Sequence, residues 1–190
     1  EGLESVFELF EKELGTGNNA AYLKNLFEKS YLEHAILADA TRYLANELFK
    51  AYGLVIIDGD RSDLKKIFAP YVKKELLEQT SFNQVNETNE VLKAYNIQVN
   101  PREINLFYIE NNLRERILFE NNEYKINNTE LRFSEEALLS ILENSPEKFS
   151  PNAVLRPAYQ ESVLPNLAYV GGNAEIMYWI ELKDHFVSIN

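Results

Sequence analysis

The sequence contains no cysteine and only two histidines among its 190 residues. The lack of cysteine excludes a disulfide scaffold, a cysteine-ligated zinc site and a cysteine nucleophile, and it fits a reducing compartment. His34 and His185 lie far apart in the sequence, so a histidine-rich metal site is not expected. These absences favour a cytoplasmic protein that requires no metal.

Long hydrophobic runs and basic blocks are also lacking. Every apolar run is far shorter than the ~20 residues needed to cross a bilayer, and the N-terminal residues lack the basic start and long apolar middle of a signal peptide. The 30 acidic residues outnumber the 19 basic ones, which gives a net charge of −11. This charge argues against nucleic acid and anionic membranes as the main partners.

What the sequence does contain is the composition of a globular protein, with 45% hydrophobic and 26% charged residues. The length suggests one domain with room for a smaller attachment. The single methionine is Met177, so the sequence does not begin with Met. We interpret it as a piece of a longer protein, which can lack part of its own active site.

The first part of the chain is predicted to be helical. Apolar residues recur at helical spacing over residues 3–15 and again over 20–51, where two helical pieces are expected to join near Lys29–Ser30. Gly53 is expected to end this stretch, because glycine adopts the left-handed conformation that often follows a helix.

A buried strand is predicted next, because residues 53–58 read GLVIID, with four apolar residues in a row. The polar loop that follows contains Asp58 and Asp60. Loops at this place in α/β proteins bind ligands, although ordinary loop structure and helix capping explain both aspartates as well. Two helices are predicted over 63–79 and 82–95, which completes the alternation typical of α/β proteins.

Residues 104–133 have a different pattern, in which short apolar segments alternate with the asparagine pairs at 111–112, 121–122 and 127–128. Asparagine tolerates positive φ angles, so each pair is a credible tight turn. The segment predicts an antiparallel meander of about four strands. Arg114 and Arg116 share one face of it, which is most simply a solvated face.

The last part of the chain combines helices and a strand. Ser134 is predicted to cap a helix. The segment NLAYVGG, residues 166–172, is predicted to form a strand followed by a glycine turn. Asn173 is predicted to cap a final helix over 174–186. The fold class expected from these elements is α/β.

Polar and aromatic side chains are densest between Ser150 and Leu182, in a concentration that a purely structural segment rarely needs. No general base is evident among them, so the catalytic residues stay unknown. The candidate substrate-binding residues are Asn152, Arg156, Gln160, Tyr169, Gly171, Gly172, Glu175 and Trp179.

Several of these candidates have a structural explanation as well. Arg156 either forms a salt bridge or anchors an anionic substrate group. Gly171–Gly172 is either a plain turn or a place where a ligand approaches a helix N-terminus. Glu175 either complements the helix dipole or binds a substrate amine, and Trp179 is either a packing residue or part of the site.

Motifs across nearly the whole chain occur in the same order in one known family. They are YGLVIID (52–58), IFAP (67–70), PREINLFYI (101–109), SPN (150–152), LRP (155–157), YQ (159–160), LP (164–165), LAYVGG (167–172), AEI (174–176) and YW (178–179). This pattern resembles the family of the bacillithiol biosynthesis cysteine-adding enzyme, the cysteine ligase BshC.

The resemblance implies an internal fragment of a ligase that adds cysteine to glucosaminyl malate through an amide bond, in the last step of bacillithiol biosynthesis in certain bacteria. It also implies part of a Rossmann-like core with a large helical insertion and a small antiparallel β meander. The expected divisions are a helical segment 1–52, a strand plus helices in 53–100, and the meander followed by helix, strand, Gly-Gly and helix in 101–190.

The resemblance further implies ATP as the energy source and a full-length homodimer with a C-terminal coiled coil. The family's N-terminal glycine-rich motif is absent here, so the fragment alone is expected to be inactive. Two rival functions stay open. One is a nucleotide-binding, nucleotidyltransferase-like domain with another substrate, and the other is a non-catalytic helical assembly module.

In an amide-forming ligase, Arg156 could clamp a malate carboxylate or a phosphate, and Asn152 and Gln160 could bond sugar hydroxyls. The backbone N–H groups of Gly171 and Gly172 could bind an anion. Glu175 could bind an amine, and Tyr169 could close the pocket.

Overall fold

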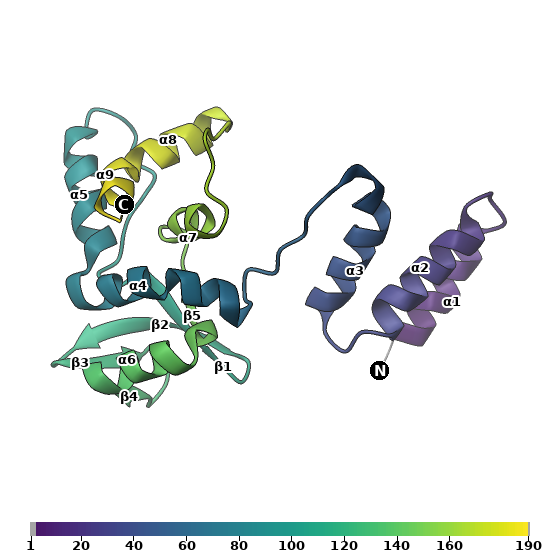
Figure 1. Ribbon diagram of the computed structural model, residues 1–190, viewed down its shortest axis with the longest axis horizontal. Coiled ribbons are helices and arrows are strands. Elements are labelled where there is room, and N and C mark those ends of the chain that lie inside the picture. The colour runs from purple at the N-terminus through teal and green to yellow at the C-terminus, as the bar shows by residue number, and fades with distance from the viewer. Residues whose placement is uncertain (1–2, 190) are drawn as a thin grey trace. The chain divides into compact units, whose positions relative to one another are not determined.

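The computed structural model describes residues 3–189, which form nine α-helices, two short 3₁₀ helices and five β-strands (Figure 1). The predicted α/β class is confirmed. The chain divides into two compact units, Glu1–Asp58 (unit 1) and Gly59–Asn190 (unit 2).

Unit 1 is helical. The predicted stretch 20–51 does contain two helices, but the break lies at residues 33–36 and not near Lys29–Ser30. Ile36 has an extended backbone (φ −125°, ψ 146°), so the helical path is interrupted before the next helix begins. Gly53 ends the stretch with φ 71°, as predicted. The elements are α1 (Leu3–Leu14), α2 (Ala20–Leu32), α3 (Leu37–Phe49) and η1 (Lys50–Tyr52).

Few side chains of unit 1 are buried. Phe27 lies 5.0 Å from Phe10 and 5.9 Å from Tyr31 between ring centroids, which joins α1 to α2. Among the described residues of α1, α2, α3 and η1, only Leu26, Ser30 and Ala40 are buried. Unit 1 therefore buries little apolar surface of its own.

The strand predicted at 53–58 is wrong. Residues 54–58 have no regular secondary structure, and Val55 is 79% exposed. An apolar run becomes a buried strand only where neighbouring strands accept its backbone hydrogen bonds. Unit 1 offers no strand among its described residues, so this segment has no partner there.

Unit 2 contains a five-stranded sheet of order β4-β3-β2-β1-β5, in which all neighbouring strands are antiparallel. The meander predicted over 104–133 is confirmed as the first four strands. The fifth strand was not predicted from the sequence. It pairs with β1 through Leu106↔Pro151 and Tyr108↔Phe149. The strands are β1 (Leu106–Glu110), β2 (Leu113–Glu120), β3 (Glu123–Ile126), β4 (Arg132–Phe133) and β5 (Phe149–Pro151).

The asparagine pairs form the turns of this meander. Positive φ angles occur at Asn111 (45°), Asn112 (68°), Asn121 (53°) and Asn122 (66°), and also at Asn128 (57°). Two successive residues with positive φ define the type I′ turn, whose twist matches that of the strands it joins. The two hairpin turns are therefore specified by the local sequence.

One face of the sheet packs against two helices, α4 (Ser62–Glu78) and α6 (Glu135–Asn144) (Figure 1). The Oγ of Ser134 accepts a hydrogen bond from the N–H of Ala137 at 3.2 Å, so this predicted cap is confirmed. A turn of 3₁₀ helix, η2 (Pro146–Lys148), leads from α6 to β5. The buried side chains of this core include Phe68, Val72, Leu76, Tyr108, Ile117, Ile126, Leu138, Leu142 and Phe149.

The remaining helices of unit 2 are α5 (Thr80–Val91), α7 (Arg156–Val163), α8 (Asn173–Glu181) and α9 (Lys183–Ser188). Val85, Val99, Val154 and Leu182 form a second small core, against which Tyr178 of α8 and Phe186 of α9 pack. The helix α7 instead packs against the first core through Ala158. The final helix predicted over 174–186 is divided at Leu182, whose side chain is completely buried. Its N-cap is Gly172, not Asn173.

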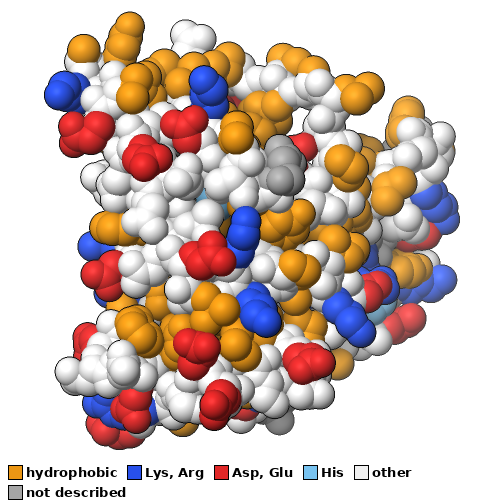
Figure 2. All heavy atoms as spheres, turned by 60° about the vertical axis from the view of Figure 1, so that its left-hand side comes forward, with side chains coloured by type: hydrophobic (Ala, Val, Ile, Leu, Met, Phe, Trp, Pro, Cys, Tyr) orange, Lys and Arg blue, Asp and Glu red, His pale blue; other side chains and the backbone are white. Residues whose placement is uncertain are grey.

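The strand predicted at 166–172 is also wrong. The segment between α7 and α8 has no regular secondary structure, and Leu167 and Val170 are almost fully exposed. Hydrophobic side chains also reach the surface elsewhere in the face that Figure 2 shows, between acidic and basic ones.

Candidate functional site

The predicted site residues lie on three pieces of unit 2. Asn152 follows β5, Arg156 and Gln160 are on α7, and the others lie in the loop 164–172 or on α8. Arg156 is exposed, and its Nη1 donates a hydrogen bond to Gln160 Oε1 at 3.0 Å, one helical turn away. Within residues 3–189, Arg156 forms no salt bridge, which was the structural alternative for this residue.

Glu175 is held by two donors at the start of α8. The hydroxyl of Tyr169 donates to Oε1 at 2.8 Å, and the backbone N–H of Gly172 donates to Oε2 at 3.2 Å. The hydrogen bond from Tyr169 is the main reason why the pKa of Glu175 lies below its ordinary value, followed by that from Gly172 and by the charge of Arg156. The same carboxylate raises the pKa of Tyr169.

Arg156 and Glu175 are brought together by the fold. The charge of Arg156 on α7 affects the pKa values of Tyr169, Glu175 and Tyr178, so its guanidinium lies within electrostatic reach of this cluster of three side chains. The hydroxyl of Tyr178 donates to the carbonyl of Ala153, which ties α8 to the segment before α7. An exposed cation and an exposed anion therefore lie within electrostatic reach of each other at the surface.

Aromatic stacking fixes the loop that carries Tyr169. Its ring lies 4.0 Å from that of Trp179 at an angle of 14°, and Trp179 in turn lies 5.1 Å from Phe186. A Cβ atom at Gly171 would lie 2.9 Å from Tyr169 Cε1 and 3.1 Å from Glu175 Cβ. Gly171 is therefore required for this close packing, whereas a Cβ at Gly172 would meet no atom within 4 Å.

Asn152 belongs to a different arrangement. Its Nδ2 donates to Asn105 Oδ1 at 2.8 Å, and its Oδ1 accepts from the N–H groups of Val154 at 2.8 Å and Leu155 at 3.3 Å. The side-chain amide of Asn152 thus holds the turn before α7 and contacts the loop before β1. Its polar atoms are engaged within the protein.

Behind Asn105 lies a buried carboxylate that the sequence analysis missed. Glu75, 1% exposed, accepts hydrogen bonds from the N–H and Oγ of Ser81 at 2.9 and 2.6 Å, and from the N–H and Nδ2 of Asn105 at 2.9 and 3.2 Å. It therefore satisfies donors at the start of α5 and in the loop before β1. A signal was present, because Glu75 falls on the same face of α4 as Phe68 and Val72.

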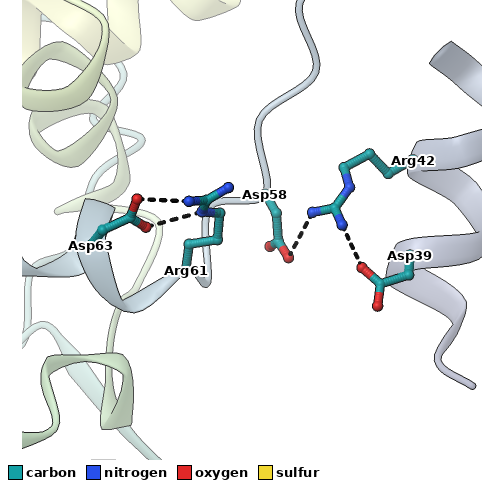
Figure 3. A network of polar contacts seen from close by, with 5 residues as sticks. All are labelled: Asp39, Arg42, Asp58, Arg61 and Asp63. Atoms are coloured by element: carbon teal, nitrogen blue, oxygen red, sulfur yellow. Dashed lines mark hydrogen bonds and ion pairs between the residues drawn. The ribbon is translucent and has the colours of Figure 1, made fainter.

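Asp58 and two aspartates on helices, Asp39 and Asp63, pair with arginines, as Figure 3 shows. In unit 1, Arg42 pairs with Asp39 at 2.7 Å and reaches Asp58 at 3.9 Å. In unit 2, Arg61 makes two hydrogen bonds to Asp63, at 3.0 and 2.8 Å. Asp58 thus has a structural partner.

Lys65 is a second residue that the sequence analysis missed. It is buried, and its Nζ donates to the carbonyl of Phe149 at 2.8 Å and lies 3.2 Å from Asp60 Oδ1. It also lies 5.5 Å from the ring centroid of Tyr159, whose hydroxyl donates to the carbonyl of Gly59 at 2.7 Å. Lys65 therefore ties α4 to β5 and to the loop before α4.

Surface cavities of about 640, 340 and 310 Å³ occur among residues 3–189, and no predicted site residue lines any of these. Within residues 3–189, no group of three or more histidine, aspartate and glutamate side chains could hold a metal ion. No helix in the same range has the length and apolar character needed to cross a membrane.

Comparison with known families gives the class of the protein first. Residues 1–190 match the family model described as "Bacillithiol biosynthesis BshC, N-terminal Rossmann-like domain". The match covers the whole chain and agrees with the α/β class of the structure. The chain belongs to the BshC family of bacillithiol biosynthesis.

Curated relatives carry the name "Putative cysteine ligase BshC". The chain is 60% identical over 190 residues to the protein from Flavobacterium johnsoniae, which covers 100% of the chain and 36% of the relative. It is 61% identical over 184 residues to that from Flavobacterium psychrophilum, covering 97% and 35%, and 30% identical over 193 residues to that from Staphylococcus saprophyticus, covering 99% and 36%. The chain thus spans about a third of the length of the curated relatives it matches.

Proposed function

We propose that the chain contributes substrate-binding residues to a ligase that joins cysteine to glucosaminyl malate by an amide bond, in the last step of bacillithiol biosynthesis. Its membership of the BshC family and the name of its relatives support this proposal. The structural observation that supports it is that exposed Arg156 lies within electrostatic reach of Tyr169 and Glu175, which are hydrogen-bonded to each other.

The chemistry of this cluster suits the two substrates. A guanidinium binds a carboxylate with two parallel hydrogen bonds, so Arg156 would hold the malate group, and Gln160 beside it would bond a sugar hydroxyl. Glu175, kept ionised by Tyr169 and Gly172, would bind the amine of cysteine. Trp179 and Gly171 would hold Tyr169 in place for this role.

Two expectations change in the light of the contacts. Asn152 would act as a support for the turn before α7, because its amide is already bonded to Asn105. The N–H of Gly172 is not free for an anion, because it donates to the Glu175 carboxylate. ATP remains the proposed energy source of a cytoplasmic, homodimeric full-length enzyme, but no residue of this chain is assigned to it.

Arg156→Ala in the full-length enzyme tests the proposal. With glucosaminyl malate, cysteine and ATP, the wild type should form bacillithiol, detected by mass. The variant should lose about a hundredfold in rate, ~3 kcal/mol, the size of one lost charge-stabilising contact. Arg132→Ala on β4, outside the cluster, is the matched control and should keep full activity.

The possible outcomes separate function from site. If the wild type makes no bacillithiol with any nucleotide, the proposed reaction is wrong. If the wild type makes it and Arg156→Ala is unaffected, the reaction stands but the substrate site lies elsewhere.

A further inference from the structure

A cleft of about 340 Å³ lies between β2 and the loop before β1, and no predicted site residue takes part in it. Two arginines line it, Arg102 from the loop and Arg116 from β2. Its apolar lining includes Phe82 from the first turn of α5, together with Leu118 and Phe119 from β2. The cleft therefore combines positive charge with an apolar surface.

Among the described residues, neither arginine has a counterion. Neither guanidinium forms an ion pair or a hydrogen bond with any residue between 3 and 189. A shortage of acidic side chains cannot explain this, because the sequence has 30 of them and a net charge of −11. A guanidinium keeps its charge and its forked donors at any physiological pH, so the pair can bind a carboxylate or a phosphate.

The two walls of the cleft are held rigidly. The backbone N–H of Arg102 donates to Asn105 Oδ1 at 3.0 Å, and its carbonyl accepts from Asn105 Nδ2 at 2.6 Å. Asn105 is itself fixed by the buried carboxylate of Glu75. On the other wall, Arg116 is paired with Phe107 of β1 and Leu118 with Lys125 of β3. A preformed site loses little entropy when a ligand binds.

Further basic side chains lie near the cleft. Arg114 lies two residues before Arg116 on the same face of β2, and its guanidinium stacks 3.8 Å from the ring centroid of Phe107. Lys125 follows on the neighbouring strand, opposite Leu118. Within the lining, Arg102 and Arg116 outnumber the one acidic residue, Glu103. Beyond it, Glu120 and Glu123 form the next pair along the two strands.

We infer that this cleft binds a small organic anion, with its carboxylate or phosphate on Arg102 and Arg116 and its apolar body against Phe82 and Phe119. The volume lies near the lower end of the range for small-molecule sites. This inference does not rest on the proposed ligase reaction, since it involves none of the residues assigned to that reaction.

A local probe tests it in the full-length enzyme. 4-Fluorophenylalanine at position 119 reports ligand entry through its ¹⁹F resonance, which is independent of enzyme activity. Titration with phenyl phosphate should shift this resonance to saturation, and inorganic phosphate should bind more weakly because it lacks the apolar body. Benzoate in a parallel titration distinguishes a carboxylate site from a phosphate site.

The variants decide whether the two arginines hold the anion. Arg102→Gln and Arg116→Gln should each raise the Kd for phenyl phosphate at least tenfold, and Arg116→Lys should have a smaller effect. Arg114→Gln is the matched control, on the same strand and face but outside the cleft, and should change the Kd less than threefold. Arg156→Ala should leave the Kd unchanged.

Three results would overturn the inference. The first is a ¹⁹F resonance that does not move with either anion. The second is an equal loss of affinity in Arg114→Gln and Arg116→Gln, which would mean unspecific attraction to a basic surface. The third is an equal shift with uncharged benzyl alcohol, which would mean an apolar cleft without anion recognition.

Discussion

Units 1 and 2 come from one chain but bury their apolar residues to very different extents. Unit 2 encloses a core of sheet and helix side chains, many of them less than 5% exposed. The helices of unit 1 are at least as rich in apolar residues as those of unit 2, yet Val6, Leu9 and Leu37 are 57%, 59% and 71% exposed. Apolar composition alone therefore does not make a core, and unit 2 is the part that holds its structure by its own packing.

The largest expected effect contrasts the core of unit 2 with the helices of unit 1. Phe68→Ala removes a ring that is 1% exposed and lies 5.4 and 5.2 Å from the rings of Tyr71 and Tyr159. It should lower the free energy of unfolding by about 4 kcal/mol. Leu26→Ala in unit 1 should leave the unfolding transition of unit 2 unchanged. Urea unfolding followed by circular dichroism measures both, and equal losses would show that the two units unfold together.

A pH effect should come next in size. Burial lowers the pKa of His185 to about 4, and neither ring nitrogen has a hydrogen-bond partner among the described residues. The unfolded chain binds this proton near pH 6.5 and the folded chain does not, so stability falls as the pH drops from about 6.5 towards 4. The loss should reach about 3 kcal/mol.

The matched variants for this effect are His185→Phe and His34→Phe. His185→Phe should remove this part of the acid destabilisation, whereas His34→Phe in unit 1 should retain it. Urea midpoints measured between pH 4 and 7 give the comparison. An unchanged pH profile in His185→Phe would assign the acid sensitivity to other groups.

The buried network of unit 2 should give a smaller effect. Glu75→Gln keeps the shape of the side chain but leaves one acceptor oxygen for donors from Ser81 and Asn105. We expect a loss of about 2 kcal/mol, because buried donors remain unpaired. Exchange of the amide hydrogens of Ser81 and Asn105 should accelerate in the same variant. Normal protection at both amides would contradict the role of Glu75.

The smallest effect is expected from the surface pairs of unit 1. Arg42→Ala removes the contacts to Asp39 and Asp58, all of whose side chains are partly exposed. Exposed ion pairs contribute less than about 1 kcal/mol. Thermal unfolding in low and high salt should therefore differ little between variant and wild type. A larger loss would mean that this network organises unit 1 more than its exposure suggests.

Local patterns predicted much of unit 2 correctly. The asparagine pairs indicate the hairpin turns because positive φ is a property of single residues, and Ser134 caps its helix through a contact three residues away. The predictions of strands at 53–58 and 166–172 are wrong because burial of an apolar run depends on partner strands that the run itself does not encode. β5 was missed for the same reason, since its partner is β1.

The candidate site was predictable only in part. Arg156 lies within electrostatic reach of Tyr169 and Glu175, and all three were predicted because of their polar or charged side chains. Asn152 turned out to be bonded to Asn105, 47 residues away in the sequence, which no local pattern shows. Long-range contacts of this kind set which polar side chains are available for a substrate.

The strand order of unit 2 also has a consequence for how the chain folds. The strands β1 to β4 are neighbours both in the sheet and in the sequence, and the turns β1–β2 and β2–β3 have only two residues. Hairpins of this kind form within ~1–10 μs. β5 reaches β1 only after α6 and η2 have been inserted between them, and closing such a longer loop costs more entropy. We therefore expect the return of β5 and the helices after it, and not the meander, to limit the folding rate of unit 2.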